Sequence, residues 1–257
     1  MKQLLLPGWY AGEPRITLSG AAFRHLAVVR RMQEGDRLDA VDRRGARYCL
    51  RVERVGRGEC EVSLAPRPGD RVTEGGGAPP RAGRVPITLL QCLPKGRKID
   101  LIVRQATEAG VQRIVLLVSE HCVSRPSTDD HRAGRLERIA GEALEQSGGS
   151  TLPGIEGPRP FASIEGGDWG TALLLDENPG AGSSLHGLLA GRPRAVSLLV
   201  GPEGGLSAAE ISRARAAGFH PVHFDTGVLR VETAATFALG AVMTILQERD
   251  EWRTGQD

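Results

Sequence analysis

Short apolar runs of strand length alternate with stripes of helical periodicity between residues 85 and 247, and this alternation constrains the fold most. The candidate strands are short and apolar, and they are 85–91, 114–118, 171–176, 196–200 and 222–225. The candidate helices repeat apolar residues every three or four positions, and they are 99–109, 131–147, 208–217 and 232–247. This order predicts a mostly parallel sheet covered by helices on both faces, with ligands bound beyond the carboxyl ends of its strands.

Another run of short strands precedes residue 66. These strands are parted by arginine and glycine, and they are 37–42, 46–55 and 59–65. A helix-like stretch at 21–32 follows Ser19, a candidate helix cap, and places His25, Val28 and Val29 on one side. Together these elements indicate a β-meander or a small barrel.

The two regions are separated by residues 66–86, which are rich in glycine, proline and charge. Almost no large apolar side chain occurs there, and such a composition is typical of a linker. We therefore predict a first domain at 1–70, a linker at 71–85 and a second domain at 86–250.

Composition limits the classes of function. The net charge is +2, yet the first 70 residues hold 13 Lys and Arg against 9 Asp and Glu. Nearly all the cations are arginine, which suits phosphate contact, although solvated surface charge is an alternative. No apolar run approaches the ~18 residues of a membrane span, so we expect no membrane association. The four scattered cysteines lack a C-x-x-C pair, which is typical of free thiols in a reducing cytoplasm.

Two histidine-containing stretches are candidate metal ligands, His121-Cys122 and His220-Pro-Val-His223. Neither has further ligands at the spacing of a zinc site. The sequence therefore predicts no metal.

The turn Gly201-Pro202-Glu203-Gly204-Gly205 stands between a strand and a helix. Ser207 and Glu210 fit a capping box, which places the helix start directly after the glycines. Glycines at such a corner allow a ligand to approach the backbone, although a tight turn with an exposed glutamate explains the pattern equally well.

A nucleotide-phosphate cradle is one interpretation of this turn, and three features disfavour it. The chain has neither G-x-G-x-x-G nor G-K-[ST] here, and Glu203 would repel a phosphate. The acidic strand end Leu173–Glu177 precedes the turn, whereas the acid follows it in dinucleotide-binding folds.

A second strand–loop–helix corner, DTGVLRVETAATFALG at 225–240, repeats the arrangement. Arg230 and Glu232 lie at its turn, and Thr233 lies near the helix start. Two adjacent corners that each display polar groups predict a binding site.

The paired motifs resemble the bacterial 16S ribosomal RNA uridine-N3 methyltransferases, which belong to the SPOUT class. LLVGPEGGLSAAE is followed about 25 residues later by VLRVETAA. The resemblance extends over nearly the whole chain. It includes the stretches HLAVVRRMQEGDRLDAVD, KGRKIDLIVRQATEAGV and EALEQSGGSTLP. Three positions depart from the family pattern: Val231 replaces a threonine, Gly149 an arginine and Gln105 a lysine.

The resemblance implies a PUA-like β-barrel followed by a SPOUT α/β methyltransferase domain with a C-terminal trefoil knot. It also implies S-adenosylmethionine as the cofactor, a cytoplasmic homodimer, and the 16S rRNA of the small ribosomal subunit, in its assembled form, as the substrate. Carried onto this chain, the cofactor-binding residues are Leu175, Gly201, Pro202, Glu203, Gly204, Gly205, Leu229, Arg230 and Thr233.

Methylation of uridine N3 requires an unpaired base that loses its N3 proton, and a sulfonium donor needs no metal. We predict that Arg230 stabilises the electron-rich uracil and that Glu232 is a general base or positions the cofactor. The residues that we expect to contact RNA are all cationic, and they are Arg24, Arg30, Arg31, Arg43, Arg44, Lys95 and Arg97. A knotted methyltransferase acting on another RNA, such as tRNA, and a non-catalytic RNA-binding assembly factor are the alternatives.

Overall fold

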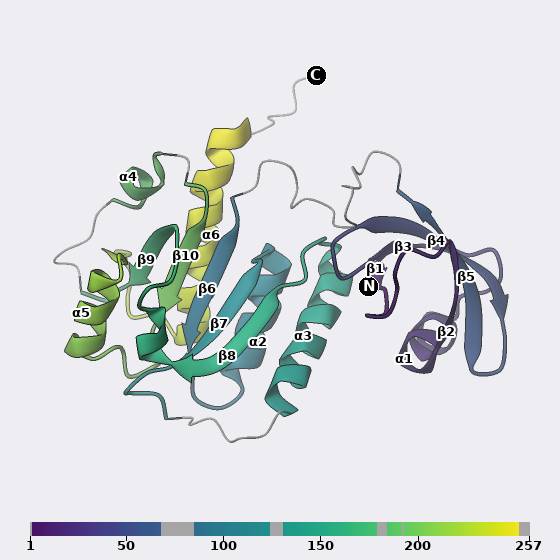
Figure 1. Cartoon of the computed structure of the whole chain (residues 1–257), viewed down its shortest axis with the longest axis horizontal. Coiled ribbons are helices and arrows are strands. Elements are labelled where there is room, and N and C mark those ends of the chain that lie inside the picture. Colours follow the sequence, from purple (N-terminus) through teal and green to yellow (C-terminus); the bar gives the residue numbers. More distant parts are fainter. Residues whose placement is uncertain (1, 68–84, 124–130, 179–183, 192, 252–257) are drawn as a thin grey trace. The chain divides into compact units, whose positions relative to one another are not determined.

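The computed structural model describes residues 2–67, 85–123, 131–178, 184–191 and 193–251 (Figure 1). Its internal contacts divide the chain into two compact units. The first unit comprises residues 1–82 and 141–152, and the second comprises residues 83–140 and 153–257. The predicted linker at 71–85 falls almost entirely outside the described residues and stays a prediction.

The first unit is a five-stranded mixed sheet with the order β1-β3-β4-β5-β2. Its strands are β1 (Gln3–Leu5), β2 (Arg15–Ser19), β3 (Arg37–Val41), β4 (Arg47–Val55) and β5 (Glu59–Pro66). β1 runs parallel to β3, and all other pairs are antiparallel. Alternate residues of β2 and β5 face a core that includes Leu18, Leu26 and Leu50. The predicted strands before residue 66 are thus confirmed, whereas the prediction missed β1 and β2.

The helix-like stretch predicted at 21–32 differs from a regular helix. It consists of α1 (Gly20–Phe23) and a π-helical turn at Arg24–Val29. Ser19 is the N-cap residue, as predicted, but its side chain makes no capping hydrogen bond. Val28 and Val29 are 59% and 66% exposed, and Leu26 is the residue of the turn that enters the core. The wider π-turn shifts the helical periodicity, which explains the displaced face.

Residues 141–152 belong to the first unit through bonds to its N-terminal strand. The Gln3 side-chain amide donates to the backbone carbonyls of Leu144 (3.1 Å) and Gly149 (2.6 Å). The Leu5 N–H donates to the Glu145 carboxylate at 2.9 Å, and the Lys2 N–H donates to the Glu145 carbonyl at 2.9 Å. These bonds fix β1 to the second half of α3 (His131–Ser147), and the sequence prediction had placed this segment in the domain at 86–250.

Glu145 gives the stability of the first unit a predicted pH dependence. Burial raises the pKa of its carboxyl, although the hydrogen bond from the Leu5 N–H opposes the shift. A carboxyl whose folded pKa exceeds its unfolded value stabilises the protein below the unfolded value, and this contribution is lost as pH rises through the folded pKa. Glu145→Gln is therefore expected to gain stability relative to the wild type from about pH 4 upwards, where an unperturbed glutamate ionises. Urea denaturation midpoints at a series of pH values measure this, and a constant difference between the two proteins would contradict it.

The second unit is a six-stranded parallel sheet with the order β11-β9-β10-β6-β7-β8. Its strands are β6 (Ile87–Cys92), β7 (Arg113–Val118), β8 (Gly154–Pro160), β9 (Thr171–Leu175), β10 (Val196–Val200) and β11 (His220–Val222). Every residue of β10 is buried, as a strand covered on both faces requires. The predicted parallel sheet is confirmed, but the sequence prediction did not contain β8.

The helices of this unit are α2 (Lys98–Ala109), the first half of α3, α4 (Leu185–Leu189), α5 (Ala208–Ala216) and α6 (Val231–Glu251), with a 3-10 turn at Phe161–Ile164. The predicted stripe of α2 is confirmed, since Ile99, Ile102, Val103 and Ala106 are all buried. None of the helices that the structure describes has the length and apolar character needed to cross a membrane.

Candidate functional site

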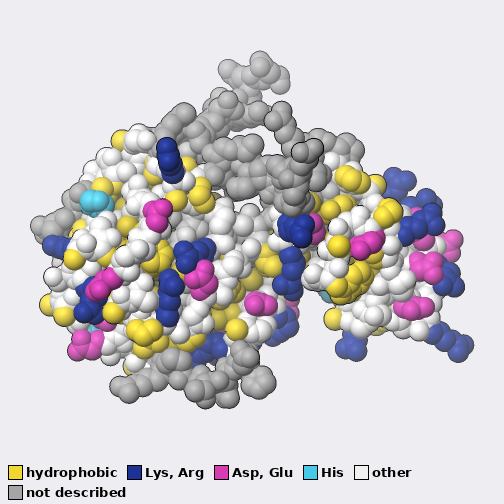
Figure 2. Space-filling view, in the orientation of Figure 1, with side chains coloured by type: hydrophobic (Ala, Val, Ile, Leu, Met, Phe, Trp, Pro, Cys, Tyr) yellow, Lys and Arg dark blue, Asp and Glu magenta, His cyan; other side chains and the backbone are white. Residues whose placement is uncertain are grey.

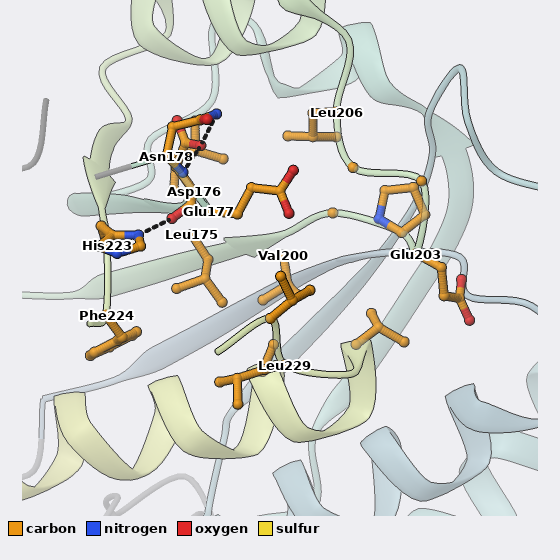
Figure 3. Close-up of a pocket in the computed structure, with 18 of the residues that line it drawn as sticks. Leu175, Asp176, Glu177, Asn178, Val200, Glu203, Leu206, His223, Phe224 and Leu229 are labelled. Carbon is orange, nitrogen blue, oxygen red and sulfur yellow. Dashed lines mark hydrogen bonds between the residues drawn. The ribbon is translucent and has the colours of Figure 1, made fainter. Parts of the chain in front are cut away.

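A pocket of about 230 Å³ opens at the carboxyl ends of β9, β10 and β11, where polar corners were expected (Figure 3). Three loops enclose it: the β9 loop (residues 176–178), the glycine turn (residues 201–205) and the β11 loop (residues 223–230). Much of the lining is apolar and comes from the ends of β9 and β10, the segment after the glycine turn, α5, the β11 loop and α6. These apolar residues are Leu174, Leu175, Val200, Leu206, Ile211, Phe224, Val228, Leu229, Val231 and Ala234. The arrangement suits a ligand with an apolar body and a few polar groups.

The glycine turn packs closely against the loop that follows β7. A Cβ on Gly204 would lie 3.0 Å from the Cβ of His121, and Gly205 has a φ of +69°. The His121 ring nitrogen Nδ1 lies 3.0 Å from the Gly204 carbonyl and 3.2 Å from the Gly205 carbonyl. Glycine at 204 therefore allows the close approach to His121, and glycine at 205 suits the positive φ of the turn.

The predicted capping box at the start of α5 is confirmed. The Ser207 hydroxyl accepts from the Glu210 N–H, and the Glu210 carboxylate accepts from the Ser207 N–H at 3.0 Å. The other oxygen of Glu210 accepts from the Glu120 N–H at 2.8 Å, and the side chain is only 7% exposed. This one carboxylate thus fixes both the end of the glycine turn and the loop after β7.

Glu203 does not face the pocket with its carboxylate, which points away from the space between the loops (Figure 3). It accepts from the Lys98 ammonium at 2.8 Å and from the Lys95 N–H at 3.1 and 3.2 Å. Burial alone would raise the pKa of Glu203, but the hydrogen bonds from Lys98 and the backbone outweigh it and lower the pKa. The carboxylate is therefore an anion that holds the loop before α2.

The β9 loop brings acidic groups to the opposite side of the pocket. The Asp176 carboxylate accepts from both the backbone and side-chain amides of Asn178 at 3.0 Å. Its N–H donates to the Val222 carbonyl, and its carbonyl lies 3.1 Å from Nδ1 of His223. Glu177 extends its carboxylate into the space between the three loops (Figure 3).

The β11 loop and the start of α6 hold the residues predicted for catalysis. Leu229 lines the pocket, whereas Arg230 and Thr233 are exposed beside it and are not part of its lining. The Arg230 guanidinium forms no ion pair with any residue that the structure describes. Glu232 is more enclosed, and its Oε2 lies 3.5 Å from the Lys98 ammonium.

The cations expected to contact RNA occupy two places. Arg24 belongs to the π-turn, Arg30 and Arg31 follow it, and Arg43 and Arg44 form the exposed β3–β4 turn. The Asp42 carboxylate shapes that turn by accepting from the amides of Arg44 and Ala46. Figure 2 shows Lys and Arg side chains on the visible face of the first unit, interspersed with Asp, Glu and hydrophobic side chains. Lys95 and Arg97 lie instead in the second unit, between β6 and α2, where the Lys95 amide meets Glu203.

Several site residues were not predicted from the sequence. Lys98 directly follows Arg97 and carries no motif of its own, and the sequence around His121 suggests only a metal ligand. Glu177 belongs to the acidic strand end Leu173–Glu177, and that strand end is the sequence signal for this side of the pocket. Among the described residues, no three His, Cys, Asp or Glu side chains gather as metal ligands would.

Comparison with known proteins gives the family. The model of an RNA methyltransferase domain matches residues 81–243, and the model of an RNA methyltransferase PUA domain matches residues 18–65. A Synechocystis protein is 31% identical over 241 residues, which are 91% of this chain and 75% of the relative. A Mycobacterium tuberculosis protein is 29% identical over 88% of this chain and 85% of the relative. Both are named ribosomal RNA small subunit methyltransferase E. The chain belongs to the ribosomal RNA small subunit methyltransferase E family.

Solved structures show the fold of this methyltransferase E family. The enzyme of that name from Neisseria gonorrhoeae, bound to S-adenosylmethionine, is 25% identical, with a TM-score of 0.80 over 95% of this chain and 98% of the other. A Legionella pneumophila protein in complex with the same cofactor is 25% identical, with a TM-score of 0.79 over 95% of this chain and 97% of the other. The predicted fold class, a PUA-like part and a SPOUT α/β part, is confirmed, and the trefoil knot stays a prediction.

Gln105, one of the positions expected to depart from the methyltransferase E family pattern, makes a hydrogen bond between two helices. Gln105 accepts a hydrogen bond of 2.7 Å from the Thr236 hydroxyl, which joins α2 to α6. A lysine there would have no hydrogen-bond acceptor to offer that hydroxyl. Gln105 therefore serves the packing of the two helices that carry Lys98 and Glu232.

Proposed function

We propose that this protein transfers a methyl group from S-adenosylmethionine to N3 of a uridine in 16S rRNA, within the assembled small ribosomal subunit. The observation that carries the proposal is the pocket formed by three loops at the carboxyl ends of neighbouring parallel strands, in a chain of the methyltransferase E family. Two proteins of similar fold hold S-adenosylmethionine, and the curated relatives are named for the RNA of the small subunit. The uridine, its N3 position and the assembled substrate follow from the resemblance of the paired motifs.

The chemistry of the pocket fits this cofactor. Leu175, Val200 and Leu229 offer apolar surface to an adenine ring, and the glycine turn, which includes Pro202, lets a ligand approach the backbone. The carboxylates of Asp176 and Glu177 offer negative charge to a cationic ligand. When bound, S-adenosylmethionine supplies a methyl group attached to a sulfonium sulfur. The leaving group is a neutral thioether, so the transfer requires no metal.

The residues of the chain then have to favour loss of the N3 proton and orient the base. Arg230 follows a pocket-lining leucine and is free to approach a uracil or its phosphate, where its charge stabilises the anion that forms. We assign Glu232 as the general base or as a group that positions the cofactor, and we assign Thr233 to cofactor binding. Both lie in the first turn of α6, where the positive end of the helix dipole favours anions.

RNA binding is assigned to five arginines of the first unit and to two cations of the second, and these are Arg24, Arg30, Arg31, Arg43, Arg44, Lys95 and Arg97. Arginine contacts phosphate bidentately, so a basic first unit can hold the RNA backbone while the second unit acts on the base. The family resemblance adds a homodimer, a cytoplasmic location and the knotted chain to this proposal.

Salt dependence tests the RNA-binding assignment. Replacing Arg31 and Arg44 together by alanine is expected to reduce the slope of log affinity against log salt concentration by about 1.5, since two phosphate contacts are lost. The matched control replaces Arg54 and Arg67 by alanine. This removes the same charge from two arginines that are not assigned to RNA contact and that pair with Glu61 and Asp39. Filter binding or fluorescence anisotropy with a 16S rRNA fragment measures both slopes. Equal reductions of the slope in the two variants would show that net charge alone sets the salt dependence of RNA binding.

Two measurements separate the proposal from its alternatives. Calorimetry of the purified protein is expected to show S-adenosylmethionine binding, and its absence would favour a non-catalytic assembly factor. Mass spectrometry of rRNA from a strain lacking the protein is expected to show loss of N3-methyluridine. Retention of that nucleoside in rRNA, with loss of a methylated nucleoside from tRNA, would favour another RNA substrate.

A further inference from the structure

Lys98 contacts two segments beside the pocket, the glycine turn and the start of α6. Its ammonium nitrogen Nζ lies 2.8 Å from Oε1 of Glu203 in the glycine turn. The same atom lies 3.5 Å from Oε2 of Glu232 in the first turn of α6. One cation at the start of α2 therefore contacts a carboxylate from each of the two sequence motifs.

The contact with Glu203 is part of a larger clamp. Both oxygens of Glu203 also accept from the N–H of Lys95, three residues before Lys98. The hydrogen bond to Glu203 is the main reason that the pKa of Lys98 is raised, so the ammonium stays charged at physiological pH. The loop before α2 and the glycine turn are thus held together by one ion pair and the backbone.

The contact with Glu232 compensates the charge of an enclosed carboxylate oxygen. Oε2 of Glu232 is enclosed by protein and has no hydrogen-bond partner among the described residues. Arg230, two positions earlier, does not pair with it, and the Lys98 ammonium is the cation within 4 Å. An enclosed carboxylate oxygen without a compensating cation is costly, so Glu232 depends on Lys98 to keep its place.

We propose that Lys98 is a positioning residue that holds Glu203 and Glu232 in register, and thereby fixes the glycine turn relative to the start of α6. This inference rests on the proposed function, because these two corners are the walls assigned to the cofactor. The ammonium group contacts two anions, so we expect the effect to follow the charge of the side chain. Lys98 acts through the two glutamates rather than on the reacting atoms.

Cofactor affinity is the first test. Lys98→Met keeps the length of the side chain and removes its charge, and we expect it to raise the S-adenosylmethionine Kd roughly tenfold. Lys98→Arg restores the charge and is expected to recover most of the affinity. Arg104→Met is the matched control, because Arg104 is an exposed cation of the same helix and is expected to bind the cofactor as the wild type does. A lowered melting temperature with an unchanged Kd in Lys98→Met would reduce Lys98 to a structural role and overturn the inference.

Hydrogen exchange is the second test and needs no cofactor. In Lys98→Met, amides of residues 203–206 and of 231–235 are expected to exchange faster together, while the amides of β7 stay protected as in the wild type. Unchanged exchange at either corner overturns the inference. If the wild-type protein binds no S-adenosylmethionine but both corners loosen in the variant, the proposed function fails while the positioning role of Lys98 stands.

Discussion

Alanine at position 230 is expected to slow methyl transfer roughly 100- to 1000-fold at saturating cofactor and RNA. The reason is that Arg230 is exposed at the pocket and forms no ion pair with a described residue, so its charge is available to the substrate. For the same reason the substitution should leave stability within about 0.5 kcal/mol of the wild type.

Single-turnover kinetics with reconstituted small subunits lacking the methyl group measure this rate. Arg230→Lys is the informative companion, because it keeps the charge but loses the planar guanidinium. A lysine variant close to wild-type rate would indicate that charge alone suffices, and a slow one would indicate bidentate contact. Near-normal turnover in the alanine variant would remove Arg230 from the catalytic assignment.

Glu210→Ala is expected to lower the free energy of unfolding by about 2–4 kcal/mol, the largest stability effect that we predict for a single polar side chain here. Its carboxylate is 7% exposed and serves the N–H groups of Ser207 and Glu120. Alanine would leave both amides without their acceptor, and it would also remove half of the capping box of α5.

Chemical denaturation followed by circular dichroism measures the loss. Glu210→Gln is the control, because one amide oxygen can still accept from one of the two N–H groups. An intermediate loss for the glutamine variant is expected. A loss below about 0.5 kcal/mol for the alanine variant, in the range of ordinary surface substitutions, would contradict the role given to this carboxylate.

The sequence predicted the second unit well because its elements are marked by local physics. Continuous apolar runs such as Val196–Val200 suit a strand that is buried on both faces, and Ser207 with Glu210 fixes a helix start within one turn. The strand order could not be predicted in the same way. β9 lies between β11 and β10 because of contacts between residues far apart in the chain, which no local pattern records.

The first unit shows where local patterns mislead. The stretch after Ser19 has helical periodicity, yet it takes a π-turn, and Val28 and Val29 are exposed. The three-residue strand β1 was too short to leave a periodic signal, and its place beside β3 is fixed by distant partners of Gln3 and Leu5.

The candidate site was predicted in its position but only partly in its contacts. The paired corners indicated a pocket at the strand ends, and the glycine turn and Leu229 do line one. The partner of Glu203 could not be read from the sequence, since Lys98 lies more than a hundred residues earlier. The roles assigned to Arg230, Glu232 and Thr233 stay predictions.

The grouping of residues 141–152 with the N-terminal sheet means that the first unit is discontinuous along the chain. A gene fragment that ends near residue 70 would encode β1 without the carbonyls that Gln3 binds and without the carboxylate that Leu5 binds. Because these three hydrogen bonds are lost, we expect the fragment to be less stable than the same sheet in the whole chain. Since α3 continues across the division at residue 140, we also expect insertions within this helix to be tolerated less well than insertions in an exposed loop.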